Sequence, residues 1–207
     1  MLRKLGLLVL VAWSMTGVAS AQVAMLTQVT GDVKVAGGDG SRSAVPFLKV
    51  NDGDTLTLAA SARVQMVYLS SGRQEVWTGA GPVKVGTQQS TSSLTPQASQ
   101  VPALILRQLE KTPAVGQHGK TGMVMLRSVD DLGALDTLEK DYHDYRAKAA
   151  PDDTTPEVFY LTGLLDLGDT QTARKVLDDL KSRQATQPAY GPVVEHFSRL
   201  LAEASQK

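Results

Sequence analysis

Short runs of alternating apolar and polar residues fill the chain from residue 25 to about residue 85, and Gly, Asn or Asp separates one run from the next. A period of two is typical of half-buried strands, and the small polar residues are typical of turns. The pattern therefore predicts an all-β part. We expect its strands at Met25–Thr30, Val33–Ala36, Phe47–Val50, Thr55–Leu58, Arg63–Leu69, Gln74–Thr78 and Pro82–Val85.

The predicted strand Arg63–Leu69 is apolar on both faces. Val64, Met66 and Tyr68 share one face, and Val67 lies on the other. This pattern indicates a strand in the interior of a sheet. Gly72 then allows a turn into the next strand, because glycine adopts positive φ at little cost.

From residue 128 onward the apolar residues recur every three or four positions, which predicts helices. Ser128 is a candidate cap for the first helix, and Thr155 caps the second with Pro156 at its first position. Gly168 fits the end of the second helix, and Asp169 or Thr170 can begin the third. The apolar stripes are Leu132, Leu135, Leu138, Tyr142 and Tyr145, then Val158, Phe159, Leu161, Leu164 and Leu165, then Ala173, Val176, Leu177 and Leu180, and finally Val193, Val194, Phe197, Leu200 and Leu201.

The segment between these parts is mixed in character. Residues 87–101 are small and polar and carry too little apolar surface to offset the entropy of ordering, so we expect a linker. Residues 102–127 form a connecting segment with a short helix at Ala103–Lys111 and an extended or strand-like run at Met123–Leu126.

The predicted fold is α+β in two segregated parts. Residues 22–86 form a small all-β domain, as a short-strand sandwich or a solenoid-like fold, and residues 128–207 form antiparallel helices, because the connections are short.

The first residues have the order of a secretory signal peptide. Arg3 and Lys4 precede the apolar run Leu5–Val18, and Ala19-Ser20-Ala21 supplies small residues for cleavage between Ala21 and Gln22. As a helix the run reaches about 20 Å, against roughly 30 Å for the bilayer interior. We expect residues 1–21 to be removed, leaving a periplasmic or secreted chain with no membrane span.

Composition narrows the possible partners and chemistry. The chain has no cysteine, which excludes disulfides and thiol chemistry. Its formal net charge is +0, whereas proteins that bind nucleic acid usually carry a basic surface. Acidic residues are concentrated after residue 128, whereas basic residues prevail before it. This split implies two parts with different surfaces.

Four short motifs resemble the FecR-like domain of bacterial envelope proteins. They read TGDVKV at residues 30–35, VNDGDTL at 50–56, ARVQMVYLSSG at 62–72 and GPVKV at 81–85. The chain departs from the family at Ser71-Gly72, where an acidic residue and Gly are usual. A cleavable signal also replaces the cytosolic arm and spanning helix of the sigma-factor regulators in that family. The resemblance implies an envelope binding or sensing module without direct sigma-factor control.

The segment Glu157–Gln187 resembles a single degenerate tetratricopeptide unit. Phe159, Gly163, Gly168-Asp169 and Ala173 lie near the family's aromatic and small positions. Such solenoids need about three repeats to bury a continuous core. We therefore favour an α-hairpin within a small helical bundle, with the tetratricopeptide-like hairpin as the alternative.

No segment of the sequence assembles a catalytic or metal-binding constellation. Residues 114–121 fit a loose phosphate-loop pattern but lack the preceding buried strand and the following helix. The histidines His118, His143 and His196 are isolated, and residues 51–54 indicate an Asx-stabilised turn. The acidic pairs at 130–131, 152–153 and 178–179 are expected to be solvated or to cap helices. We predict a protein that is not an enzyme, with no catalytic residue, metal or cofactor.

The resulting hypothesis is a binding or scaffolding protein of the cell envelope. The β part would bind one envelope component, and an acidic face at Asp178, Asp179 and Lys181 would dock a partner protein. The alternative is binding of cell-wall glycan, with Trp77 and Arg73 as candidate contacts because Trp77 could stack on a sugar. The sequence leaves the oligomeric state open.

Overall fold

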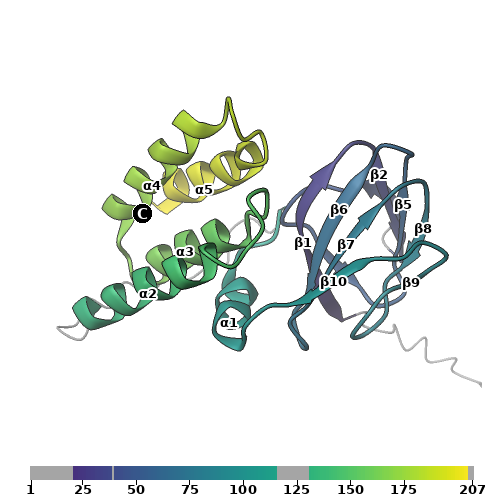
Figure 1. Ribbon diagram of the computed structural model, residues 1–207, viewed down its shortest axis with the longest axis horizontal. Helices are drawn as coiled ribbons and strands as arrows, with labels where there is room; N and C mark the ends of the chain where they lie inside the picture. Colours follow the sequence, from purple (N-terminus) through teal and green to yellow (C-terminus); the bar gives the residue numbers. More distant parts are fainter. Residues whose placement is uncertain (1–20, 39, 116–130, 205–207) are drawn as a thin grey trace, which may run out of the picture.

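Strands precede helices along the chain, and the two kinds of element occupy separate regions (Figure 1). The computed structural model describes residues 21–38, 40–115 and 131–204. The chain is α+β with segregated parts, as the sequence predicts. The expected signal segment 1–20, the phosphate-loop pattern from residue 116 onward, Met123–Leu126 and Ser128 lie outside the described residues.

Two antiparallel sheets form the β part. The first, called the β6 sheet, has the order β10-β7-β6-β1-β4, and the second, called the β5 sheet, has the order β3-β2-β5-β8-β9. The strands of the β6 sheet are β1 Gln22–Thr30, β4 Lys49–Asn51, β6 Arg63–Tyr68, β7 Arg73–Thr78 and β10 Gln97–Gln100. Those of the β5 sheet are β2 Val33–Gly37, β3 Gly40–Ser43, β5 Thr55–Leu58, β8 Gly81–Lys84 and β9 Thr91–Ser92.

The sheets pack face to face as a sandwich. Their shared interior includes Leu26, Val35, Leu56, Met66 and Val83, all of which are buried. Strand β6 lies between β7 and β1, so the prediction of an internal strand is confirmed. Its alternation sends Val64, Met66 and Tyr68 into the sandwich and Val67 toward the helices.

The predicted linker at residues 87–101 is wrong, because this segment adds a strand to each sheet. Strand β9 pairs with β8, and β10 pairs with β7. Backbone hydrogen bonds supply the order that the polar side chains cannot. The Ser90 hydroxyl also lies 2.7 Å from the Tyr68 hydroxyl, and Leu94 packs against the sandwich core.

Five helices follow within the described residues. They are α1 Ala103–Lys111, α2 Asp131–Arg146, α3 Thr155–Asp166, α4 Thr170–Arg183 and α5 Tyr190–Ala204. Among them, none combines the length and apolar character needed to cross a bilayer. Helix α3 is buried on nearly all sides and contacts the other four, so it is the centre of the helical part.

Helix α2 approaches α3 closely at Gly163. A Cβ atom placed there would lie 2.5 Å from Cδ1 of Leu138, so a larger residue would displace the Leu138 side chain. The packing of Leu138 on α3 therefore depends on this glycine.

The ends of α3 and α4 match the sequence pattern in part. Gly168 has a φ of 73° after α3, and the Asp169 carboxylate accepts a hydrogen bond from the Thr172 amide at 2.9 Å, so both expectations hold. Thr155 is not the cap of α3. It is the first helical residue, Thr154 holds the cap position, and the Asp153 side chain accepts from the Thr155 amide at 2.9 Å.

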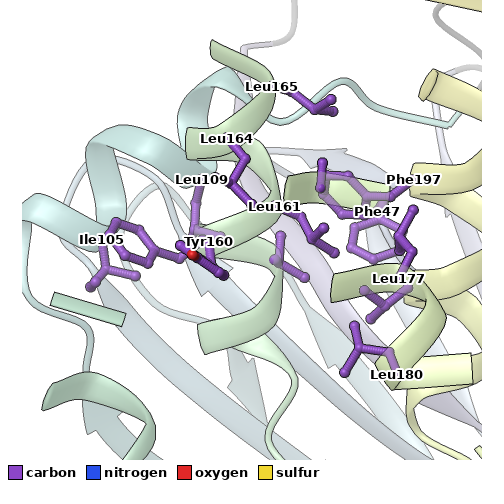
Figure 2. Packing of buried hydrophobic residues seen from close by; sticks show 14 of the residues in the cluster. Phe47, Ile105, Leu109, Tyr160, Leu161, Leu164, Leu165, Leu177, Leu180 and Phe197 are labelled. Carbon is purple, nitrogen blue, oxygen red and sulfur yellow. The ribbon is translucent and has the colours of Figure 1, made fainter. Parts of the chain in front are cut away.

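The sandwich and the helices share a second core (Figure 2). Met25, Phe47 and Val67 come from the β part and join the helical cluster around Leu161 and Phe197. The helix-facing side of the β6 sheet is thus partly covered. The two parts are segregated in sequence but are packed as one unit.

Phe47 is one of these β-part contacts and is buried. It adopts a φ of 65°, its amide donates to the Leu26 carbonyl at 2.7 Å, and its carbonyl accepts from Val115 at 3.1 Å. This backbone places its ring against His196 of α5, with the ring centroids 4.3 Å apart and nearly parallel. A non-glycine residue in this conformation is strained, so the surrounding contacts must hold it.

This contact predicts a pH dependence of stability. Burial lowers the pKa of His196 from 6.5 to about 4. Between pH 6.5 and about 4, His196 is protonated in the unfolded chain but neutral in the folded chain. The stability that is present above pH 6.5 is therefore lost as the pH falls toward 4. We expect the free energy of unfolding to drop by up to about 3 kcal/mol over this range.

Urea titrations at pH 7, 5.5 and 4 measure this loss. His196→Phe keeps a stacked ring without a titrating group, so its unfolding free energy should fall less steeply. His143→Gln, at an exposed position, is the control and should follow the wild type. Equal slopes for the wild type and His196→Phe would contradict the assignment.

Candidate functional site

A cleft of about 450 Å³ lies between the helix-facing side of the β6 sheet and the turn from α2 to α3. Its volume is in the range of ligand-binding pockets. The strands contribute Arg63, Gln65, Gln74, Val76, Gln97, Ala98, Ser99 and Gln100. Pro102, Tyr145, Lys148, Ala149, Ala150 and Asp153 complete the lining.

The floor of the cleft is a band of amide side chains across three adjacent strands. Val76 of β7 lies between Gln65 of β6 and Gln97 of β10 in the register, and Gln74 lies beside Ser99. These residues share the helix-facing side of the sheet because side chains alternate along a strand. Gln65 and Gln74 are buried beneath the turn from α2 to α3, whereas Gln97 and Ser99 of β10 are exposed.

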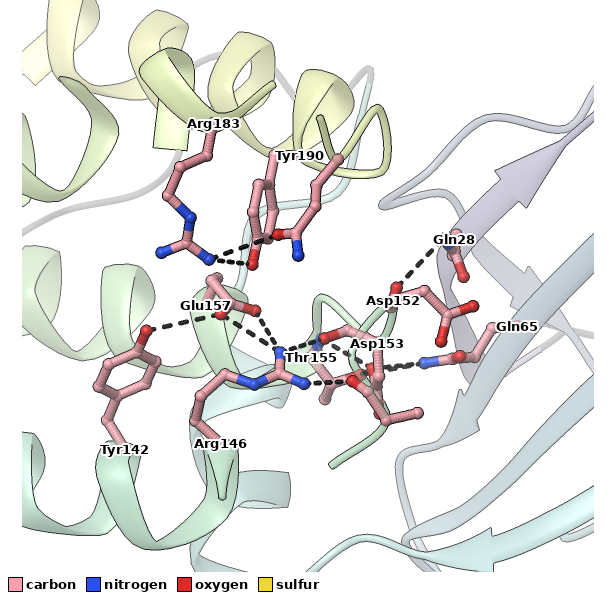
Figure 3. A network of polar contacts seen from close by, with 12 residues as sticks. Gln28, Gln65, Tyr142, Arg146, Asp152, Asp153, Thr155, Glu157, Arg183 and Tyr190 are labelled. Carbon is pink, nitrogen blue, oxygen red and sulfur yellow. Dashed lines mark hydrogen bonds and ion pairs between the residues drawn. The ribbon is translucent and has the colours of Figure 1, made fainter. Parts of the chain in front are cut away.

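Asp153 fixes the wall of the cleft to its floor (Figure 3). Its side chain is buried and accepts from Gln65 Nε2 at 2.8 Å and from Gln74 Nε2 at 3.1 Å. The amide of Thr155 and its hydroxyl donate to the same carboxylate at 2.9 and 2.6 Å. One carboxylate thus joins two strands to the start of α3, and its donors offset the cost of burying the charge.

Arg146 supports this wall from behind. Its guanidinium donates to the carbonyls of Ala150 and Asp153 and pairs with Glu157 at 3.1 Å. The Glu157 carboxyl is fully buried, and burial raises its pKa while Arg146 opposes the rise. Tyr142 donates to the same carboxyl at 3.5 Å, as Figure 3 shows. The turn that forms the wall is therefore held by charge-assisted hydrogen bonds.

A second acidic residue, next to Asp153, pairs with a residue of the cleft lining. The exposed Asp152 pairs with Arg63 of β6, and this hydrogen bond lowers the pKa of Asp152. Its carbonyl accepts from Gln28 Nε2 at 3.3 Å. Both acidic residues thus contact the β6 sheet. Asp152 is exposed, as the sequence pattern predicted, whereas Asp153 is buried.

Tyr145 supplies the aromatic surface of the cleft. It is half-buried, as expected from its place in the α2 stripe, and burial raises its pKa. The phenol therefore stays neutral at physiological pH and can donate a hydrogen bond.

Trp77 is not an exposed ligand contact, so that prediction is wrong. Its side chain is 1% exposed, points into the sandwich, and donates from Nε1 to Glu75 at 3.1 Å. Arg73 donates from Nε to the same carboxylate at 2.7 Å. Both candidate glycan contacts therefore donate hydrogen bonds to the buried Glu75 carboxylate.

The predicted docking face is exposed but lies apart from the cleft. Asp178, Asp179 and Lys181 all lie on the solvent side of α4, and Asp179 pairs with Arg183 at 3.1 Å. No residue of α4 lines the cleft. None of the site residues predicted from the sequence therefore lines the cleft.

The described residues hold no group of three or more His, Asp or Glu side chains arranged for a metal ion. The turn at residues 51–54 has the expected side-chain bond, because the Asp54 carboxylate accepts from the Asn51 amide at 2.9 Å. His143 is exposed on α2, whereas His196 is buried against Phe47.

Comparisons with protein-family models, curated proteins and solved structures gave no match for this chain. The cleft must therefore be interpreted from its own chemistry. It offers amide donors and acceptors, one aromatic ring and basic side chains at its rim, which suits recognition of a polar, extended ligand.

Sequence reasoning missed Asp153 and the glutamines that bind it. Two signals were available. Gln65 interrupts an otherwise apolar internal strand, and a polar residue there needs a buried partner. Asp153 lies just before a helix start marked by Pro156. Neither signal identifies the other residue, because they are 88 positions apart.

Replacing Asp153 by Ala is expected to lower the free energy of unfolding by about 2–4 kcal/mol, because it leaves buried donors of Gln65, Gln74 and Thr155 unpaired. Asp152→Ala removes an exposed pair and should cost under about 1 kcal/mol. Guanidinium denaturation of both variants measures the difference. Similar losses for the two would show that the Asp153 contacts are not structural.

Proposed function

We propose that the chain is an exported, non-catalytic binding protein of the bacterial cell envelope and that its cleft holds part of a partner protein. The observation that carries this proposal is the cleft, with its polar floor and a wall fixed by Asp153 and Arg146. A preformed site of this kind loses little entropy when a ligand binds.

Export is supported by the sequence of the first 21 residues, and cleavage after Ala21 agrees with the start of β1. Strand β1 starts at Gln22, the residue after the predicted cleavage site. Ala21 contributes only a carbonyl that accepts from the Asp52 amide at 3.3 Å. Cleavage there would leave the β6 sheet intact.

The FecR-like motifs support an envelope role, since domains of that family act in envelope signalling. A sensing protein of this type without a cytosolic arm remains within the proposal. The acidic face of α4, at Asp178, Asp179 and Lys181, is available for a second partner and supports a scaffold that binds two proteins. The helical part fits either a small bundle or a tetratricopeptide-like hairpin built on α3 and α4.

Binding of cell-wall glycan is the second candidate. Burial of Trp77 removes its expected stacking surface, and Tyr145 is the aromatic residue that lines the cleft instead. A half-buried tyrosine beside amide groups is compatible with a sugar, so the experiment below distinguishes the two ligands.

The mature protein is expected to begin at Gln22. Intact-mass measurement of protein purified from the periplasm or the medium checks this, because removal of residues 1–21 gives a defined mass. Retention of the segment from Met1 would contradict export by a cleaved signal.

Photo-crosslinking in intact cells tests the binding site. A photo-reactive residue in place of Ser99 or Lys148 should give a discrete adduct with an envelope protein, because both residues line the cleft. The same residue at Lys34, on the exposed side of the β5 sheet, is the control. Adducts with wall glycan alone, or equal adducts at Lys34, would overturn the proposal.

A further inference from the structure

The outer edge of β10 is open. Strand β10 is the last strand of the β6 sheet and pairs on one side with β7, and no other described strand pairs with it. All four of its residues are exposed. An open strand edge presents backbone donors and acceptors that can pair with another extended chain.

The other sheet edges carry features that discourage such pairing. Strand β4 carries Lys49, β3 carries Arg42, and β9 is only 2 residues long. Charged residues and short strands are common ways of protecting an edge. The sequence of β10 is QASQ, with neither a charge nor a proline.

All four residues of β10 line the cleft. Gln97 and Ser99 face the helices and line it through their side chains, whereas Ala98 and Gln100 point to the other side of the sheet. The Gln100 amide indeed donates to the Ser71 carbonyl. Because Ala98 and Gln100 also line the cleft, they reach it through the backbone.

The opposite side of the cleft carries the positive charge of Lys148. Lys148 is exposed on the turn after α2, beside Ala149 and Ala150. Within the described part of the chain, no carboxylate lies within ion-pair distance of its ammonium, whereas the other cleft cation, Arg63, pairs with Asp152. The Lys148 charge also helps to lower the pKa of Asp144, but Asp144 is paired with Lys140. The exposed ammonium therefore favours an acidic group on the occupant.

We infer that β10 accepts an extended segment of a partner protein as an additional strand, with an acidic side chain of that segment paired to Lys148. This inference rests on the proposed function and names the form of the ligand. Backbone hydrogen bonds to β10 provide the affinity, and the Lys148 charge provides the specificity for acidic segments. A second copy of this chain fits less well, because two copies paired at β10 would bring their Lys148 side chains into the same interface.

Selection of random heptapeptides displayed on phage, against the purified chain from Gln22, provides the probe. The expected hits alternate in polarity and carry Asp or Glu. A synthetic hit should bind Lys148→Glu about tenfold more weakly than the wild type, because the charge is reversed. Lys34→Glu is the matched control and should bind as the wild type does.

Two further measurements separate strand addition from other modes of binding. N-methylation of alternate amides in the synthetic hit should abolish binding, and hydrogen exchange should slow at Gln97–Gln100 when the unmodified hit is bound. Full binding by the N-methylated peptide, or no selected sequence, would overturn the inference. If hydrogen exchange at Gln97–Gln100 is already slow without peptide, and slows further as the protein concentration rises, a second copy of the chain pairs with β10. That result would also overturn the inference.

Failure of this inference can be distinguished from failure of the proposed function. If crosslinking at Ser99 captures an envelope protein but N-methylation does not weaken peptide binding, the binding function stands and strand addition fails. If the selected peptides bind along β10 but the cleft positions capture only glycan in cells, the envelope-protein function fails.

Discussion

The arrangement of this protein depends on one buried carboxylate. Asp153 receives donors from two strands of the β6 sheet and from the start of α3, and a buried charge is tolerated only when such donors are present. Because the buried Asp153 carboxylate needs all of these donors, the sheet and the helix are fixed relative to each other. Because Asp153 also lines the cleft, the same contacts set the distance between its floor and its wall.

The apolar contacts between the two parts have a different role from the Asp153 hydrogen bonds. Met25, Phe47 and Val67 bury apolar surface against the helices, which supplies free energy without strict geometry. The Asp153 contacts add direction, since hydrogen bonds are satisfied only over a narrow range of distance and angle. Where the helical cover ends, the residues of β10 stay exposed. The binding site is thus the part of one sheet face that the shared core leaves uncovered.

Two buried acidic residues show how the same residue type serves different purposes. Glu75 lies inside the sandwich, where Arg73 and Trp77 donate to it, so residues that looked suited to a ligand are used for internal solvation. Glu157 lies in the helical part and is neutralised by Arg146, which also holds the turn above the cleft. In each case the basic or aromatic donor is unavailable to a ligand because the buried carboxylate needs it.

The sequence by itself determined the class of the fold and the position of most elements, because the period of apolar residues and the Gly168 and Asp169 signals act over a few residues. It determined that β6 is internal, since both of its faces are apolar. Only the tertiary structure decided that residues 91–92 and 97–100 join the sheets, that Trp77 is buried, and that Asp153 meets Gln65 and Gln74. These outcomes depend on pairs far apart in the chain, and neither partner's local pattern specifies the other. Backbone pairing in particular needs no apolar side chain, so a polar segment such as β10 has no sequence period to reveal it.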